Sequence, residues 1–408
     1  MLRAIPLIVL AAVVLQPPPA ADPWPRVSAV FHQRVQQAGI VGSGLMFVRN
    51  GEIAARAFDG YQDLETKRPV DEDTIFHWAS ITKTLTGVAI MQLRDRGLLS
   101  LDDPAVKYVP ELREVHNPYG DMSQVTIRHL MTHSAGFRAP TWPWGGDQAW
   151  HPYEPARWEQ VVAMFPYTEL LFKPGTKYSY SNPGVIFLGR IIQLFSGDDY
   201  EVYITKNLFM PLGMTHSFFD RAPYHLLKHR SHSYERTDTG LQEQRFDFDT
   251  GITVSNGGLN APLGDMAKWL AFLIGDPGSA ARPLPSSTCP GCRDLYDSVL
   301  KRSSLDEMFT PQIRAKDGEG GSGDDVQAGL SCFIERHEGV ELVGHSGDQN
   351  GFISHLYLHK RSASGYVVSF NTNAHSNADA RRTTRAVDDE LRDRIIEELF
   401  KGGPRAIE

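Results

Sequence analysis

The sequence predicts a mixed α/β (α+β) fold, in which an antiparallel sheet is flanked by N- and C-terminal helices and carries an inserted, mainly helical lobe. Three observations support this prediction. The chain opens with a helix and a hairpin, and its C-terminal part alternates short β-prone segments before a charged helix. Its long middle has helical periodicity, interrupted by loops rich in Gly and Pro.

The first strands are predicted close to the N-terminus. Apolar residues recur at helical spacing after Pro25, at Val27, Val30, Phe31 and Val35. The β-prone segment Gly44–Val48 then meets Asn50-Gly51, which is a strong two-residue hairpin signal. Ile53–Phe58 returns as the second strand of this hairpin.

The C-terminal part supplies the rest of the predicted sheet. The expected strands are Leu330–Arg336, Glu341–Val343, Phe352–His359 and Tyr366–Asn371. A helix from about Asp379 to Phe400 follows. It carries one apolar stripe, at Val387, Leu391, Ile395 and Leu399.

The helical lobe is expected between these two ends. Its helices are predicted at Thr82–Asp95, Thr126–Thr132, Gly184–Phe195, Tyr200–Asn207 and Leu263–Leu273. We therefore expect one domain over residues 22–408, with the α/β lobe at about 22–80 and 326–402 and the helical lobe at about 81–325.

Composition restricts the class of protein. The chain has 408 residues and a formal net charge of −8, with 41% hydrophobic and 22% charged residues, which are ordinary values for a folded globular protein. Mild acidity argues against a nucleic-acid binder, which would present a basic face. Three cysteines are too few for a disulfide scaffold.

Residues 1–21 have the pattern of a secretory signal peptide. Arg3 gives a short basic start, and Ile5–Leu15 is an apolar run too short to span a bilayer. Ala20-Ala21 are small residues of the kind found at cleavage sites, but the prolines before them leave an uncleaved anchor as the alternative. We expect a secreted or periplasmic chain with no membrane span once the signal is removed.

The first chemical signal is Ser80-Ile81-Thr82-Lys83. A β-prone segment precedes it and a helix follows, so Ser80 is expected at a helix N-terminus, where negative charge is favoured. Residues three apart share a helix face, so the Lys83 ammonium can reach the Ser80 hydroxyl. Alone, this S-x-x-K pattern is weak, and a capping Ser beside a solvated Lys is the plain alternative.

Two further motifs make the signal specific. Tyr180 and Asn182 are expected on a loop before a helix, and Gly344-His345-Ser346-Gly347-Asp348 lies between two predicted strands. Together with Ser80-x-x-Lys83 and Leu130–Phe137, these motifs resemble the serine β-lactamase and penicillin-binding-protein superfamily, in its class C, esterase and D-amino-acid peptidase branches. The resemblance covers nearly the whole mature chain and implies a β-lactamase/transpeptidase-like fold.

The resemblance implies acyl transfer through an acyl-enzyme, with no cofactor and no metal. The catalytic residues would be Ser80 as nucleophile, Lys83 as its charged partner and Tyr180 as general acid/base. The substrate-binding residues would be Asn182, His345, Ser346, Gly347 and Asp348. The N–H groups of Ser80 and Asp348 would form the oxyanion hole. The expected partner is a small-molecule or peptide substrate, and the sequence gives no indication of an oligomeric state.

The sequence does not decide whether Tyr180 or Lys83 is the general base. Ionising a tyrosine at neutral pH costs about 4 kcal/mol, and one ammonium at roughly 4 Å returns about 4 kcal/mol at an effective dielectric of about 20. Lys83 can therefore bring Tyr180 into range. Equally, a desolvated Lys83 can be neutral and act as the base itself.

His345 departs from the Lys that many superfamily members carry at this position. It would hold a substrate carboxylate only when protonated, below a pH of about 6.5. We therefore expect an ester, amide or D-amino-acid peptide substrate rather than efficient β-lactam hydrolysis. The alternative is a penicillin-binding or sensing module that is acylated but hardly turns over, and the presence of Tyr180 favours the enzyme.

Two clusters have competing interpretations. Four of the seven tryptophans lie between Pro140 and Trp158, where they would line the site or pack within their own loop. Three histidines have helical spacing, but neighbouring basic residues favour a solvated turn over a metal site. These histidines are His225, His229 and His232.

The cysteines suggest one local bridge. Cys289-Pro290-Gly291-Cys292 has the spacing of a redox motif, a zinc half-site or a tight local disulfide. A zinc site would need two more ligands nearby and none is evident, and in a secreted chain we expect a small disulfide loop. Cys332, in a β-prone segment, is expected to be a buried free thiol.

Overall fold

The structure is a computed structural model that describes residues 22–141, 155–237, 239–244, 249–275, 295–315, 323, 325–374 and 383–401. Its largest sheet contains β1 (Gly42–Arg49), β2 (Glu52–Asp63), β3 (Arg68–Pro69), β9 (Ile313–Arg314), β10 (Asp325–Ala328), β11 (Phe333–His337), β12 (Val340–Gln349), β13 (Phe352–His359) and β14 (Ser364–Phe370). These nine strands follow the order β3-β2-β1-β14-β13-β12-β11-β10-β9. Because β1 pairs antiparallel with β14, both ends of the chain build one sheet, as predicted.

Two small sheets and twelve α-helices complete the fold within the described residues. The remaining strands are β4 (Ile75–His77), β5 (Phe218–Phe219), β6 (Ser233–Thr237), β7 (Gly240–Gln244), β8 (Leu259–Pro262) and β15 (Thr372–Ala374). The helices are α1 (Trp24–Ala38), α2 (Thr82–Asp95), α3 (Ile127–Met131), α4 (Trp158–Val162), α5 (Asn182–Ser196), α6 (Tyr200–Ile204), α7 (Met210–Leu212), α8 (Val254–Gly257), α9 (Leu263–Ile274), α10 (Leu295–Val299), α11 (Arg302–Met308) and α12 (Thr384–Ile395).

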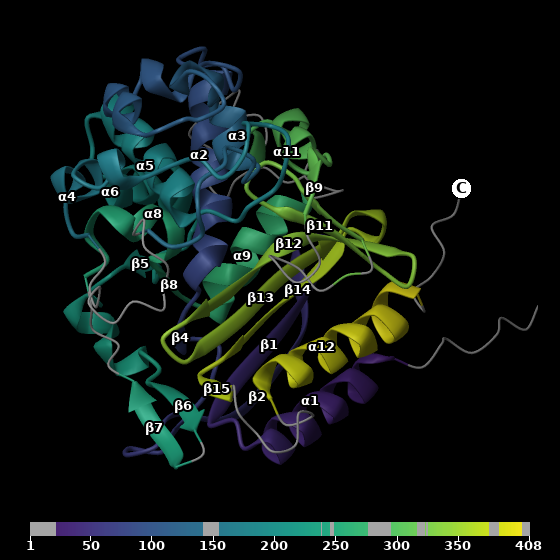
Figure 1. Cartoon of the computed structure of the whole chain (residues 1–408). Coiled ribbons are helices and arrows are strands. Elements are labelled where there is room, and N and C mark those ends of the chain that lie inside the picture. The colour runs from purple at the N-terminus through teal and green to yellow at the C-terminus, as the bar shows by residue number, and fades with distance from the viewer. Residues whose placement is uncertain are drawn as a thin grey trace, which may run out of the picture.

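The N- and C-terminal helices lie side by side on the outer face of the large sheet (Figure 1). The predicted apolar stripes produce this layer, because Val27, Phe31 and Val35 of α1 are fully buried in the same cluster as Val387 and Leu391 of α12. The hairpin between β1 and β2 also forms where Asn50-Gly51 predicted it, with both residues at positive φ (52° and 78°).

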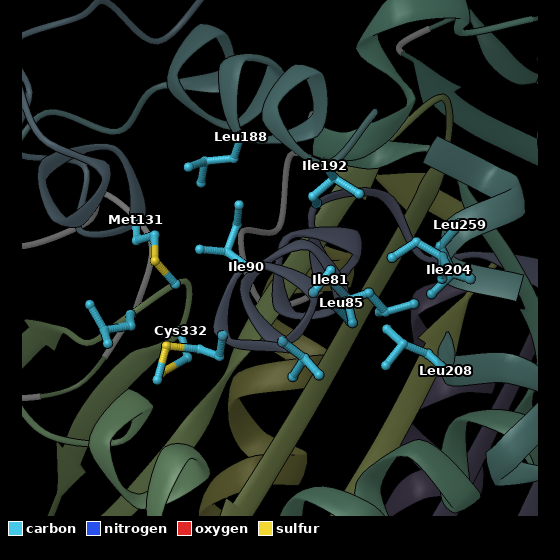
Figure 2. Close-up of a cluster of buried hydrophobic side chains, with 14 of the residues drawn as sticks. Ile81, Leu85, Ile90, Met131, Leu188, Ile192, Ile204, Leu208, Leu259 and Cys332 are labelled. Atoms are coloured by element: carbon cyan, nitrogen blue, oxygen red, sulfur yellow. The ribbon is translucent and has the colours of Figure 1, made fainter. Parts of the chain in front are cut away.

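Helices α2 and α9 cover the opposite, inner face, and the helical lobe packs around α2. Figure 2 shows Leu85 and Ile90 of α2 surrounded by side chains from α5, α6 and β8. Every residue of α2 from Thr82 to Leu93 is buried, so this helix is held from all sides. The residues at its N-terminus are therefore fixed by the core.

Several predicted strand boundaries are wrong, and the strand expected over Ile53–Phe58 runs from Glu52 to Asp63. The strand expected to end at Val343 continues to Gln349, because β12 pairs with β13 along this whole stretch. The strand expected from Leu330 begins only at Phe333, since Ser331 has a positive φ of 59° that interrupts extended backbone. Tertiary pairing and local backbone geometry here override residue propensity.

Several expectations concern segments outside the described residues. These are the signal segment 1–21, Trp142, Trp144, Trp150, and the pair Cys289 and Cys292. Within the described ranges, no helix is long and apolar enough to cross a bilayer. The same ranges hold no group of three potential metal ligands, and His232 instead lies 2.8 Å from Glu243. Cys332 is a buried free thiol, as expected.

Candidate active site

The turn that carries Ser80 is built by β4 and the residues after it. Trp78 is fully buried and is held through its backbone and its side chain. Its backbone N–H donates to Leu259 O (2.8 Å), and its indole N–H donates to Ala261 O (2.8 Å). Ala79 then adopts a positive φ of 45°, a costly conformation for a residue with a Cβ. This sharp turn places Ser80 in a short 3₁₀ turn that leads directly into α2.

Lys83 lies one turn along α2 and reaches back to Ser80. Its Nζ is 3.0 Å from Ser80 Oγ and 2.7 Å from the carbonyl oxygen of Asn256. The side chain is fully buried, and this burial lowers the pKa of the Lys83 ammonium well below its ordinary value. Desolvation thus favours the neutral amine.

Tyr180 closes the group from the other side. Its hydroxyl is hydrogen-bonded to Ser80, and its ring centroid lies 4.9 Å from Lys83 Nζ. Burial raises the pKa of the Tyr180 hydroxyl above its ordinary value. Ser80, Lys83 and Tyr180 therefore meet as expected, and burial favours the neutral form of both potential bases.

His133 supports Tyr180, a contact that the sequence did not reveal. Its ring lies 4.5 Å from the Tyr180 ring, and its Nδ1 accepts the backbone N–H of Ser181 at 3.1 Å. Burial, with Lys83 nearby, lowers the pKa of His133 well below its ordinary value. The segment Leu130–Phe137 contributed to the resemblance, but its pattern gave His133 no role.

Asn182 is the first residue of α5 rather than part of the preceding loop. Ser181 is the N-cap, whose side chain accepts the N–H of Gly184 at 3.1 Å. This cap fixes the start of α5 directly beside Tyr180. The Oδ1 atom of Asn182 is buried and has no hydrogen-bond partner among the described residues.

One edge of β12 borders the Ser80 turn. The pairing of β11 with β12 ends at Gly344, whereas β13 stays paired as far as Gln349. Strand β12 comes so close that a Cβ added to Gly347 would lie 2.3 Å from Trp78 O. Only glycine permits this approach.

Ser346 and Asp348 alternate with Gly347 on β12 and therefore project to the other face of the strand. The Asp348 carboxylate pairs with Arg385 and accepts a hydrogen bond from Asn373 Nδ2 at 3.1 Å. Its side chain is thus engaged outside the group formed by Ser80, Lys83 and Tyr180. Any role of Asp348 at the site depends on its backbone N–H.

His345 is buried, and its charge state differs from the one expected. Its Nδ1 lies 2.6 Å from the carbonyl oxygen of Ser346, which makes Nδ1 the protonated nitrogen. Burial, with Lys83 nearby, lowers the pKa of His345 to about 3. The imidazole is neutral at physiological pH, so the expected titration near pH 6.5 and the binding of a carboxylate by a charged ring are not supported.

Asn256 is a second residue that the sequence could not assign. It acts through its backbone carbonyl, which accepts from Lys83, and any residue type supplies a carbonyl. The adjacent Gly257-Gly258 pair is visible in the sequence, but it does not predict the contact between Asn256 O and Lys83.

Comparison with known proteins places this arrangement in a family. Esterase EstB of Burkholderia gladioli is 30% identical over 224 residues, which are 50% of this chain and 56% of EstB. Protein flp of Staphylococcus aureus is 27% identical over 356 residues, 86% of this chain and 64% of flp, so the chain spans less than two-thirds of that relative.

The fold and the sequence profile agree with these relatives. The D-amino acid amidase from Ochrobactrum anthropi has the same fold, with a TM-score of 0.73 and 21% identity over 94% of this chain and 100% of the amidase. The profile of the beta-lactamase family matches residues 27–391, a span that includes every residue of the site described above. The chain belongs to the beta-lactamase family.

Proposed function

We propose that the protein is a serine hydrolase that forms an acyl-enzyme on Ser80 and acts on an ester, amide or D-amino-acid peptide. The observation that carries this proposal is the buried contact of Ser80 Oγ with Lys83 Nζ, 3.0 Å apart, with Tyr180 hydrogen-bonded to the same hydroxyl. A nucleophile beside a neutral base, at the start of a rigid helix, has the geometry that acyl transfer requires.

Burial selects Lys83 as the base in this proposal. The neutral amine accepts the Ser80 proton while Oγ bonds to the substrate carbonyl carbon. The resulting oxyanion is held by the N–H groups of Ser80 and Asp348. Tyr180 then gives its proton to the leaving group and regains one from the Lys83 ammonium. A water molecule repeats the sequence in reverse to release the acid and restore Ser80.

The substrate is proposed to be uncharged at the group that meets β12. A neutral His345 offers no positive charge to a carboxylate, in contrast with a lysine at the same position. Similarity to a protein named esterase EstB, and a fold shared with one named D-amino acid amidase, support esters and amides as the substrate classes.

The direct test is turnover of nitrophenyl butyrate by the wild type and by Ser80→Ala. We expect the substitution to lower kcat by about 10⁴-fold or more, because the nucleophile is removed. Ser100→Ala, on the exposed loop after α2, is the matched control and should retain full activity. Wild-type activity in Ser80→Ala would refute the assignment.

Incubation with a β-lactam or a fluorophosphonate, followed by mass spectrometry, distinguishes the enzyme from the sensing module. Rapid loss of the β-lactam adduct with multiple turnovers would favour the enzyme. We expect labelling on Ser80 together with steady-state hydrolysis of an ester or amide. A lasting adduct with no hydrolysis of any ester, D-peptide or β-lactam tested would favour the sensor.

Secretion is part of the proposal and rests on the signal-like residues 1–21. Expression of the full chain in a bacterium should yield a periplasmic protein whose N-terminus, determined by mass spectrometry, lies near Asp22. Recovery of the uncleaved chain in the membrane fraction would favour the retained anchor.

A further inference from the structure

His77 and Gln349 join the two segments that border the site. The terminal carboxamide of Gln349 lies 2.9 Å from Nε2 of His77, and Asn260 Oδ1 lies 3.1 Å from its Nδ1. His77 is only 2% exposed and belongs to β4, three residues before Ser80. Gln349 is the last residue of β12 and follows Asp348.

The hydrogen bonds around His77 define its tautomer. Asn260 donates its amide N–H groups to Asp220 O and Gly258 O, both at 3.3 Å, so its Oδ1 faces His77 as an acceptor. Nδ1 therefore carries the proton. Burial lowers the pKa of His77 to about 4, so the ring has one proton and Nε2 has a free lone pair. The Gln349 atom placed 2.9 Å from Nε2 is Oε1, and a half-turn of the carboxamide exchanges it with the NH₂ group, which then donates to Nε2.

The Gln349 side chain contacts two parts of the site, His77 on β4 and Gly257 on α8. It shares a strand face with Gly347, which lies against the Trp78 carbonyl. A Cβ added to Gly257 would lie 3.1 Å from Gln349 Oε1, so the side chain also packs on α8. Helix α8 includes Asn256, whose carbonyl accepts from Lys83. One side chain thus connects β12 to the elements that hold both Ser80 and Lys83.

We propose that His77 and Gln349 are a positioning pair that sets the width of the oxyanion hole, which is the separation between the N–H groups of Ser80 and Asp348. This inference rests on the proposed function of Ser80. Within the described part of the chain, β12 has no strand partner beyond Gly344 on the side of β11. The bond between His77 and Gln349 therefore replaces strand pairing as the link that holds this edge at a fixed distance.

The physical reason is the steep distance dependence of oxyanion stabilisation. Donors act fully only when they lie about 2.7–3.1 Å from the developing oxyanion, and losing one donor costs about 10²–10³-fold in kcat. A loosened edge moves the Asp348 donor without removing it. We therefore expect a smaller loss than deletion of a donor, confined to kcat because the hole binds the transition state.

The test uses Gln349→Met, which keeps side-chain length and removes the hydrogen bond, together with His77→Phe and the double variant. Hydrolysis of a nitrophenyl ester and of its thiono analogue is measured per active site titrated with fluorophosphonate. We expect each single variant to lower kcat about 10-fold with KM changed less than twofold. The double variant should lose no more than either single variant, because both break one link.

The thiono ester provides a readout that a merely structural role would not move. Sulfur is larger than oxygen and a weaker acceptor, so a tight hole favours the oxygen ester, and the variants should lose part of this preference. Gln312→Met, on an exposed surface position, is the matched control and should keep both kcat and the preference.

Wild-type kcat and wild-type oxygen-to-sulfur preference in Gln349→Met would overturn the positioning pair while leaving Ser80 catalysis intact. Additive losses in the double variant would also overturn it. If His77→Phe does not fold, Gln349→Met and the shorter Gln349→Asn test the link alone. Absence of Ser80-dependent turnover in the wild type would instead refute the proposed function, so the two failures are distinguishable.

Discussion

Buried ionisable groups have different surroundings on the two faces of the central sheet. On the inner face, Lys83 and His345 are buried, and burial lowers the pKa of each so that both favour the neutral form. On the outer face, the fully buried Glu335 lies 2.9 Å from His337 and accepts hydrogen bonds from the Tyr357 hydroxyl at 2.8 and 2.9 Å. The outer acid is surrounded by donors, whereas Lys83 on the inner side contacts the Ser80 hydroxyl and the carbonyl oxygen of Asn256, neither of which is an acidic partner.

The buried groups of the outer face therefore contribute to stability, whereas those of the inner face are suited to chemistry. A buried acid with matched donors links β11 to β13, and removing one partner leaves the others without compensation for their burial. A buried base without a counter-charge lowers stability, and burial lowers its pKa, which favours the neutral form that can accept a proton. Ala79, beside Ser80, has a strained backbone. Strained residues cluster at active sites, where the surrounding structure holds them in place, so Ala79 agrees with this difference between the faces.

The largest effect is expected for Lys83→Met. Without the base, kcat for nitrophenyl butyrate should fall by about 10³-fold or more. The melting temperature should stay the same or rise by a few degrees, because a flexible apolar chain replaces a buried amine. A clear drop in melting temperature would show that Lys83 has a structural role. It would contradict the proposed difference between the inner and outer faces.

Glu335→Leu should give the opposite result. It leaves the Tyr357 hydroxyl and His337 without their acceptor, so the free energy of unfolding in urea should fall by about 3 kcal/mol or more. At a temperature where the variant is folded, kcat should stay within about twofold of wild type. A loss of kcat without a loss of stability would contradict the division between the faces.

Acid should weaken the inner face through its neutral histidines. The folded-state pKa is lowered to about 4 for His77 and about 3 for His345, whereas unfolded histidine titrates near its ordinary value. Between these values the unfolded chain binds more protons, so stability falls as pH decreases from about 6.5 toward 4, by roughly 3 kcal/mol for His77 alone.

Urea unfolding at several pH values measures this slope. The informative quantity is the difference in slope between wild type and His345→Gln, because contributions shared by the two proteins cancel. The variant should lose less stability than wild type over the same interval. Equal slopes would show that His345 is not held neutral.

The smallest effect is expected for Asn182→Ala. Its Oδ1 has no partner among the described residues, so removing the carboxamide should leave the free energy of unfolding nearly unchanged. If this oxygen binds substrate, kcat/KM should fall about 10-fold, the value of one hydrogen bond. An unchanged kcat/KM would remove Asn182 from substrate binding.

The sequence predicted the parts of the fold that depend on local periodicity. The stripe of α1, the Asn50-Gly51 turn and the full extent of α2 follow from residue spacing. The contact of Ser80 with Lys83 was equally predictable, because residues three apart share a helix face.

Features that depend on tertiary structure could not be predicted. The extension of β12 through His345 to Gln349 comes from pairing with β13, and its residues have little β-propensity. The contact of Lys83 with Asn256 O uses a backbone atom, which no side-chain pattern marks. The neutral state of His345 follows from burial, which sequence spacing does not report.

The protonation state of Lys83 decides most directly whether this residue is the base. Nuclear magnetic resonance of protein labelled with ¹³C at the lysine side chains can follow the Lys83 Cε shift with pH, and the spectrum of Lys83→Met assigns the signal. We predict a midpoint well below the ordinary lysine pKa of about 10.4, with the amine neutral when the ester is turned over. A midpoint at or above that value would mean that Lys83 remains an ammonium, and it would contradict both its role as the base and the contrast between the two faces.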